Sequence, residues 1–215
     1  MTSVLGWRKT YDRAAVLDQA DKARGRGSVR KAIKGYSTIL KHDPADHQVH
    51  ARVAPLFART KRWDEARKSF DAAALGFMKQ GFADKAIAVW KVAAHHFPED
   101  VEYWERVANE QVKRGRKADA VNSLLEGREQ LRAKRQRPLA ELLLRQVLTL
   151  DAFHFEATLD LCSLIGGEGG LAEAERLLRG LERWVKSRSM RRRLRFAQLK
   201  LAPSFKRFMA WILAT

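Results

Sequence analysis

The sequence predicts an all-α protein, a right-handed α-solenoid of stacked antiparallel helix hairpins with about twelve helices. Apolar residues recur with a helical period along almost the whole chain, and no segment of any length alternates with the period of a strand. Several glycines and prolines fall between the periodic segments, where helices end. The chain has 215 residues, of which 46% are hydrophobic, and this is enough to build a packed core.

Short turns separate the expected helices, and Gly25, Gly27, Gly81 and Gly115 lie at such breaks. Pro55 falls inside an expected helix, so we expect a kink or an early end there. We expect the helices near residues 12–24, 28–42, 46–60, 63–79, 83–97, 100–114, 117–132, 138–149, 153–165, 170–183, 187–200 and 203–214.

A spacing of small, large and apolar residues at i, i+4 and i+7 recurs along these helices. Such positions share one helix face, so we expect them to form the core. One set recurs in steps of 54 residues, at Ala32, Tyr36 and Ile39, at Ala86, Trp90 and Ala93, and at Ala140, Leu144 and Val147. A second set, also in steps of 54, lies at Ala66, Phe70 and Ala73, at Ala120, Leu124 and Gly127, and at Ala174, Leu178 and Leu181.

Residues 32–44 and 85–100 resemble the second helix of the tetratricopeptide repeat, and residues 62–70 resemble the turn that leads into it. The resemblance covers about residues 13–182. The Trp and Gly-Tyr signatures of the first helix are largely absent, and the 20-residue steps between the two sets are not a standard repeat length. We interpret those steps as one long helix that serves two motifs. The expected domains are an N-terminal extension (1–11), a repeat domain (12–182) and basic capping helices (183–215).

The resemblance implies a concave groove, lined by first helices, that binds a peptide or a partner helix. It places one set of first helices at 46–60, 100–114 and 153–165. Basic residues recur there at a step of 54, and the third copy carries Asp160 instead, so the basic stripe spans two copies. Such a stripe suits an acidic peptide, a C-terminal carboxylate or a phosphate. The predicted partner-binding residues are Arg52, Arg59, Arg106, Asn109 and Lys113.

Positive charge is concentrated at the end of the chain. The net charge is +17, and residues 183–215 hold ten basic residues and no acidic one. Charge alone does not choose among nucleic acid, anionic lipid and an acidic protein surface. The predicted polyanion-binding residues are Arg188, Arg191, Arg192, Arg193 and Arg195. An apolar stripe follows, at Phe205, Phe208, Met209 and Ile212, which suits either a membrane surface or a cap on the helical stack. We favour the cap.

No cluster in the sequence predicts a metal, a cofactor or catalysis. His42, His47 and His50 lie close in sequence but straddle a turn, and no cysteine is near them. Cys162 occupies a small packing position, which predicts a buried, inert thiol. The glycines at 166–170 lack the Lys-Ser/Thr of a phosphate loop and predict a flexible turn.

These observations predict a non-enzymatic adaptor or scaffold that docks an acidic peptide or partner protein. The alternative is a non-specific nucleic-acid-binding repeat protein that uses its basic tail, and an anionic membrane surface is a third candidate partner for that tail. We expect a monomer or weak homodimer. We expect it in the cytoplasm, because there is one cysteine and no apolar leader in Met1–Thr10. The 26 Arg against 16 Lys favour a bacterial source.

Overall fold

The computed structural model describes residues 11–167 and 169–213, and these residues contain helices and no strand. The chain divides into two compact units, residues 1–96 and residues 97–215. The boundary lies inside the stretch that the sequence assigns to one repeat domain. The two units are therefore described separately.

The described residues of the first unit, 11–96, form five helices, and each packs against the next. The third helix also contacts the fifth, so alternate helices lie in the same layer. Polar side chains tie the first helix to the third in the same way, through Arg13 with Asp46 and Arg52 with Asp21. The helices are α1 (Arg13–Gly25), α2 (Val29–His42), α3 (His47–Arg59), α4 (Trp63–Lys79) and α5 (Ala83–His96).

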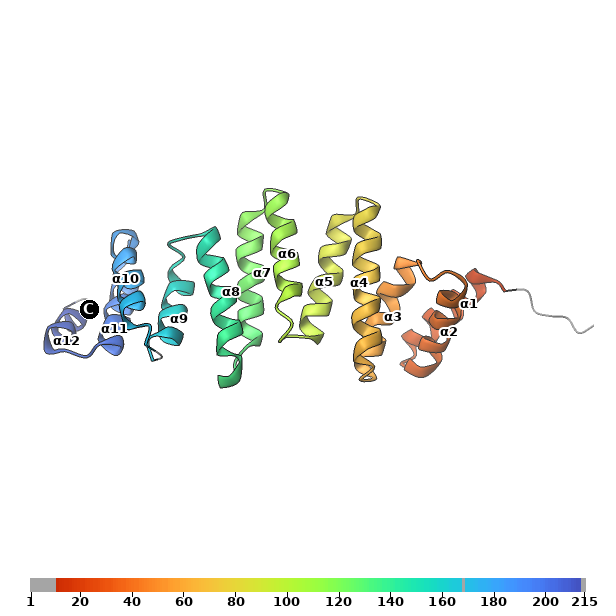
Figure 1. Cartoon of the computed structure of the whole chain (residues 1–215), viewed down its shortest axis with the longest axis horizontal. Coiled ribbons are helices and arrows are strands. Elements are labelled where there is room, and N and C mark those ends of the chain that lie inside the picture. The colour runs from red at the N-terminus through yellow and green to blue at the C-terminus, as the bar shows by residue number, and fades with distance from the viewer. Residues whose placement is uncertain (1–10, 168, 214–215) are drawn as a thin grey trace, which may run out of the picture. The chain divides into compact units, whose positions relative to one another are not determined.

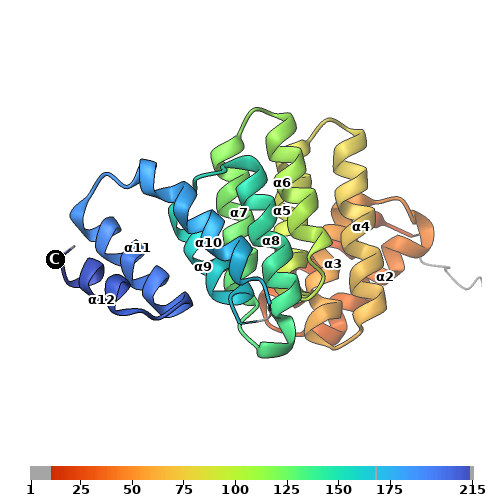
Figure 2. The ribbon, with the colours of Figure 1, turned by 60° about the vertical axis from the view of Figure 1, so that its left-hand side comes forward.

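The second unit continues the pattern of consecutive packing, and α6, α7 and α8 stand side by side in Figures 1 and 2. Its helices are α6 (Glu102–Lys113), α7 (Lys117–Gln130), α8 (Arg137–Leu150), α9 (Phe155–Ile165), α10 (Leu171–Leu181), α11 (Arg188–Leu201) and α12 (Phe205–Ile212), with short 3₁₀ segments η1 (Lys134–Gln136) and η2 (Glu182–Trp184). Within each unit, the predicted fold of antiparallel helix hairpins is confirmed.

Polar contacts join alternate helices of the second unit and define two layers. One layer holds α6, α8, α10 and α12, and the other holds α7, α9 and α11. The contacts in the first layer are Gln146–Glu105, Arg145–Glu173 and Arg207–Glu175. Those in the second layer are Arg128–Asp160 and Arg193–Glu156. Apolar packing thus holds consecutive helices together, while charged side chains link helices two apart.

Every expected helix is present, and each end lies within two residues of its prediction. Side-chain caps explain several starts: Asp12, Asp46, Ser187 and Ser204 each accept a hydrogen bond from a backbone N–H three residues further on. The expected early end at Pro55 is wrong, because α3 continues to Arg59. Proline removes one backbone donor, and the packing of α3 against α2, α4 and α5 outweighs that loss.

The predicted core positions are buried with one exception. All three members of the Ala32, Tyr36 and Ile39 group are fully buried, as is Phe70 in the second set. Trp90 is only partly buried and packs at the edge of the cluster formed by Ala74, Phe77 and Ala86. Among the tryptophans that the structure describes, the fully buried one is Trp104, on α6.

Gly127 explains how α6 and α7 approach each other around Trp104. A Cβ atom added at Gly127 would lie 2.7 Å from the indole Cδ1 and Cγ atoms of Trp104. No side chain fits there without movement of the indole, so the small residue at this core position makes room for the large one.

Candidate functional site

Of the two predicted groove residues on α3, Arg52 binds another helix and Arg59 is exposed. Arg52 Nη1 donates to Asp21 Oδ2 on α1 at 3.2 Å, and the hydroxyl of Tyr36 donates to the other oxygen of Asp21 at 2.5 Å. Burial, and then this hydrogen bond, raise the pKa of Tyr36 to about 12. Arg52 is therefore part of a polar cluster that joins three helices, while Arg59 is exposed.

The predicted groove residues of α6 lie in different surroundings. Arg106 pairs with Glu102 one turn earlier at 2.6 Å, and Lys113 lies 3.7 Å from Glu110. Asn109 lines a groove of about 360 Å³ that α6 and α8 form over α7. The charged side chain in that groove is acidic, Glu105, and it accepts a hydrogen bond from Gln146. The groove beside Asn109 therefore has no basic lining.

The layers correct one premise of the groove prediction. A step of 54 residues spans three helices, and consecutive helices alternate between layers, so an odd number of helices changes the layer. Within the second unit α6 lies in one layer and α9 in the other. Residues 100–114 and 153–165 are therefore not equivalent first helices on one face. The 54-residue recurrence marks buried core positions, and within the second unit it does not relate helices of the same layer.

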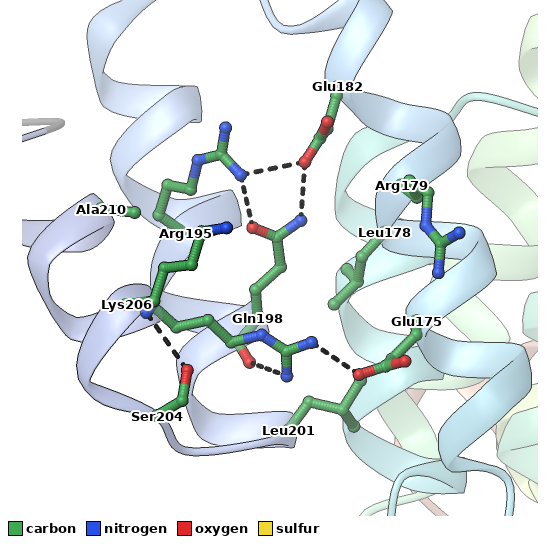
Figure 3. A pocket seen from close by; sticks show the side chains of 11 residues that line it. Glu175, Leu178, Arg179, Glu182, Arg195, Gln198, Leu201, Ser204, Lys206 and Ala210 are labelled. Atoms are coloured by element: carbon green, nitrogen blue, oxygen red, sulfur yellow. Dashed lines mark hydrogen bonds and ion pairs between the residues drawn. The ribbon is translucent and has the colours of Figure 1, made fainter.

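Two of the five predicted tail residues hold the C-terminal helices in place. Arg193 binds both carboxylate oxygens of Glu156 on α9, at 2.5 and 2.6 Å, and this hydrogen bonding lowers the pKa of Glu156. Arg195 donates to Glu182 at 2.9 Å and to Gln198, which itself donates to Glu182 (Figure 3). Both arginines are thus already neutralised by contacts inside the unit.

The other three predicted tail residues, Arg188, Arg191 and Arg192, are exposed. The Arg192 guanidinium carbon lies 5.8 Å from the ring centre of Trp211, on α12. The same indole contacts Phe196 at 5.7 Å and Phe208 at 6.2 Å between ring centres. Aromatic and cationic side chains from α11 and α12 therefore form one continuous surface.

The apolar stripe of α12 faces solvent. Phe205 is 78% exposed, and Phe208, Met209 and Ile212 are each more than a third exposed. The expectation that this stripe caps the helical stack is wrong for these four side chains. The opposite face of α12 packs on the unit instead, where Arg207 binds Glu175 at 2.7 Å. No helix in the described part of the chain is both long enough and apolar enough to cross a membrane.

A second groove, of about 450 Å³, lies between α9 and α11. Its lining is largely apolar and includes Leu159, Ala197 and the exposed ring of Phe196. Lys200 lies at this groove, with its Nζ 5.8 Å from the centre of the Phe196 ring. None of the five residues predicted to bind a partner lines this groove.

The histidine and cysteine side chains have structural roles. The rings of His42 and His47 contact Tyr11 and Phe77, and His50 Nε2 lies 3.0 Å from the Pro44 carbonyl oxygen. Among the residues that the structure describes, no three His, Cys, Asp or Glu side chains are placed to bind one metal ion. The predicted burial of Cys162 is confirmed, and burial raises its pKa to about 12. The predicted turn at 166–170 includes residue 168, which lies outside the described residues.

The sequence analysis missed one cluster, formed by Phe153 and Trp184. Their rings are 31 residues apart in sequence but stack with a centre-to-centre distance of 4.7 Å. They share a groove with Arg176, Arg179 and Arg183. The available signal was the i, i+3 and i+7 spacing of these arginines on α10 and η2, but the aromatic partner comes from another turn of the chain.

Comparison with known proteins adds little to this description. No family model matches the chain, and no curated protein matches it. The chain is similar to solved structures such as an assembly chaperone of RpL4 (13% identity, 95% of each chain covered, TM-score 0.42). Others are a TPR repeats protein from Bacteroides fragilis (13%, 95% of this chain and 84% of that one, TM-score 0.37) and pilF from Pseudomonas aeruginosa (15%, 94% and 88%, TM-score 0.30).

The hairpins within each unit are the architecture that the tetratricopeptide resemblance predicts. At these TM-scores the similar structures carry no argument about what the chain binds. Its function has to be argued from its own surfaces.

Proposed function

We propose that this protein is a non-enzymatic adaptor that docks an acidic, amphipathic segment of another protein. The observation that carries the proposal is the groove between α9 and α11, which combines apolar walls with a cation at its edge. An amphipathic helix binds such a groove by burying its apolar side chains and pairing its charged ones at the margin.

The apolar part of the surface continues beyond the groove. Phe196 lines the groove and contacts the indole of Trp211, and Phe208 contacts the same indole. Exposed aromatic residues that are grouped in this way are typical of binding surfaces, because large rings contribute most of the energy of association.

The charges around this surface favour an acidic partner. Arg192 and Lys200 both lie over aromatic rings of the surface, while Arg193 is already bound to Glu156. No acidic residue follows Glu182 in the sequence. A partner with Asp or Glu beside its apolar face would therefore meet cations without a competing carboxylate from α11 or α12.

The stripe predicted from sequence stays a second candidate position for the acidic partner. Arg59 is exposed there, whereas Arg52, Arg106 and Lys113 already pair with Asp21, Glu102 and Glu110. The proposal of a cytoplasmic protein likewise rests on the single buried cysteine.

A titration with one synthetic peptide tests the proposal. The probe is a 16-residue helix with Leu at i, i+3, i+4 and i+7 and Glu on its other face, added to the full chain in a calorimeter. We expect micromolar binding that Lys200→Glu and Phe196→Ser each weaken about tenfold or more. A matched peptide with Lys in place of Glu should not bind.

Arg59→Glu is the control variant, because it changes one exposed charge of the stripe and leaves the groove intact. If Arg59→Glu abolishes binding and Lys200→Glu does not, the stripe is the site and the groove proposal is wrong. Parallel titrations with a DNA duplex and with anionic vesicles test the other two partners. Binding to either one that is lost in Lys200→Glu, with no binding of the peptide, would contradict an adaptor.

A further inference from the structure

The stacked pair of Phe153 and Trp184 lies on a part of the second unit that the proposed adaptor function does not use. Phe153 is in the loop before α9, where its backbone N–H donates to Asp151 Oδ1 at 3.3 Å, and Trp184 is the last residue of η2. The interplanar angle is 25°. The side chains remain 45% and 50% exposed, so each ring keeps an accessible surface.

Three arginines lie in the same groove as this aromatic pair. Arg176, Arg179 and Arg183 line the same groove, which has a volume of about 450 Å³. They occupy i, i+3 and i+7 along α10 and η2, and such positions face one side of a helical segment. All three are exposed.

Two acidic residues on the same helical segment as these arginines are bound to other side chains. Glu173, whose charge acts on Arg176, is held by both terminal nitrogens of Arg145, at 2.6 and 3.0 Å. Glu182 accepts hydrogen bonds from Arg195 and Gln198. Figure 3 shows Arg179 on α10 with no bond to the other side chains drawn. The arginines of this groove are therefore available to an external anion.

We propose that Phe153, Trp184, Arg176, Arg179 and Arg183 form a binding site for single-stranded nucleic acid. Arginine binds phosphate oxygens through two hydrogen bonds, and unpaired bases stack on exposed aromatic rings. The site offers both kinds of contact within one groove. An acidic peptide uses the arginines but not a stacked pair of rings, and the bases of a duplex are closed to stacking.

This site differs from the basic tail that the sequence analysis proposed for polyanions. All five residues of that tail lie on α11, outside this groove, and two of them, Arg193 and Arg195, are bound to Glu156 and Glu182. It also shares no residue with the groove between α9 and α11. The two proposals can therefore fail independently.

Fluorescence anisotropy of the full chain with labelled 15-nucleotide oligo(dT) and oligo(rU) tests the site. Binding should weaken steeply as salt increases from 50 to 200 mM, because phosphate contacts release counterions. The triple variant Arg176→Gln, Arg179→Gln, Arg183→Gln should lose at least tenfold in affinity at 50 mM salt. It should also reduce the slope of log affinity against log salt by about 2, at about 0.7 for each phosphate contact on a single strand.

Trp184→Ala should lower the affinity by about 5- to 150-fold, the range for loss of one base–aromatic stack. It should leave the salt slope unchanged, because no charge is removed. Trp184→Phe keeps a ring and should restore most of the affinity, which separates stacking from a folding defect. Circular dichroism of each variant should match that of the parent chain.

The control is Arg188→Gln, Arg191→Gln, Arg192→Gln, which removes the same charge from the tail. If this control loses binding as strongly as the groove variant, the site is wrong. Equal affinity for a 15-base-pair duplex, an unchanged affinity in Trp184→Ala, or no binding at 50 mM salt would also overturn it. The difference between the oligo(dT) and oligo(rU) affinities shows whether the ligand is DNA or RNA.

Discussion

The two units contain the same kind of ion pair with its charges exchanged. In the first unit Asp21 on α1 binds Arg52 on α3, and in the second unit Arg128 on α7 binds Asp160 on α9. Both pairs join helices two apart, at sequence separations of 31 and 32 residues. The acid is on the earlier helix in one unit and on the later helix in the other.

In each ion pair, a third polar group contacts one of the two members and explains which helix carries the acid and which carries the base. The hydroxyl of Tyr36 is fully buried and needs an acceptor, which Asp21 provides at 2.5 Å. The carbonyl of Leu131, just after α7, accepts from Arg128 Nη1 at 3.1 Å. The acid is thus fixed on α1 by a donor, and the base is fixed on α7 by an acceptor. The other members, Arg52 and Asp160, contact their partners through the ion pair alone.

The largest expected effect follows from removing the fixed acid. Asp21→Ala should lower the free energy of unfolding by about 2–4 kcal/mol, because a buried hydroxyl loses its acceptor and Arg52 loses its partner. Chemical denaturation followed by circular dichroism measures the change. In the Tyr36→Phe background the same substitution should cost less, since no hydroxyl is left without a partner. Equal costs in both backgrounds would contradict the role given to Tyr36.

Alkaline pH should destabilise the first unit, because Tyr36 lies in it. Because the pKa of Tyr36 is raised to about 12 in the folded chain from an ordinary value near 10, its contribution is complete below pH 10 and is lost as pH rises to 12. The loss should reach about 2–3 kcal/mol by pH 12. Denaturation curves at pH 9, 10, 11 and 12 should show this loss, and Tyr36→Phe should remove it. A Tyr36 that ionises near pH 10 in a spectrophotometric titration would contradict the prediction.

The helices could be predicted from the sequence because their signals are local. Period, caps and turn residues act within about four residues of each other, and every helix end was placed within two residues. The expectations that are wrong are the full burial of Trp90 and an early helix end at Pro55. Whether a large side chain is enclosed, or whether packing outweighs a missing backbone donor, depends on helices that are distant in sequence.

The site was harder to predict because its contacts cross between alternate helices. Arg52 was assigned to a groove from a 54-residue spacing, but its partner, Asp21, lies 31 residues before it. Trp184 is a comparable case, because the ring that it stacks on, Phe153, lies 31 residues before it in the sequence. A periodic pattern identifies which face of a helix is buried, and it does not identify which helix lies opposite.

A smaller effect is expected from the fixed base of the second unit. Arg128→Met keeps most of the aliphatic stem and removes the contacts to Asp160 and to the Leu131 carbonyl. The expected cost is about 1–2 kcal/mol, below that of Asp21→Ala, because no buried tyrosine hydroxyl is involved. Thermal unfolding measures it. A larger loss of unfolding free energy than in Asp21→Ala would show that the third polar group does not determine which of the two ion pairs contributes more stability.

The smallest effects should come from the members that no third group fixes. Arg52→Gln and Asp160→Asn each remove one charge, keep a polar side chain of similar size, and leave the fixed partner with its other hydrogen bond. Since ion pairs that reach solvent contribute about 0–1 kcal/mol, each substitution should change the free energy of unfolding by less than about 1 kcal/mol. The difference in the free energy of unfolding between each variant and the parent chain should be smaller at 0.5 M salt than at 0.05 M, because salt screens the ion pair of the parent. Chemical denaturation at both salt concentrations measures it. If Asp160→Asn costs as much as Arg128→Met, the ion pair itself stabilises the contact between α7 and α9, and the Leu131 carbonyl does not determine which helix carries the base.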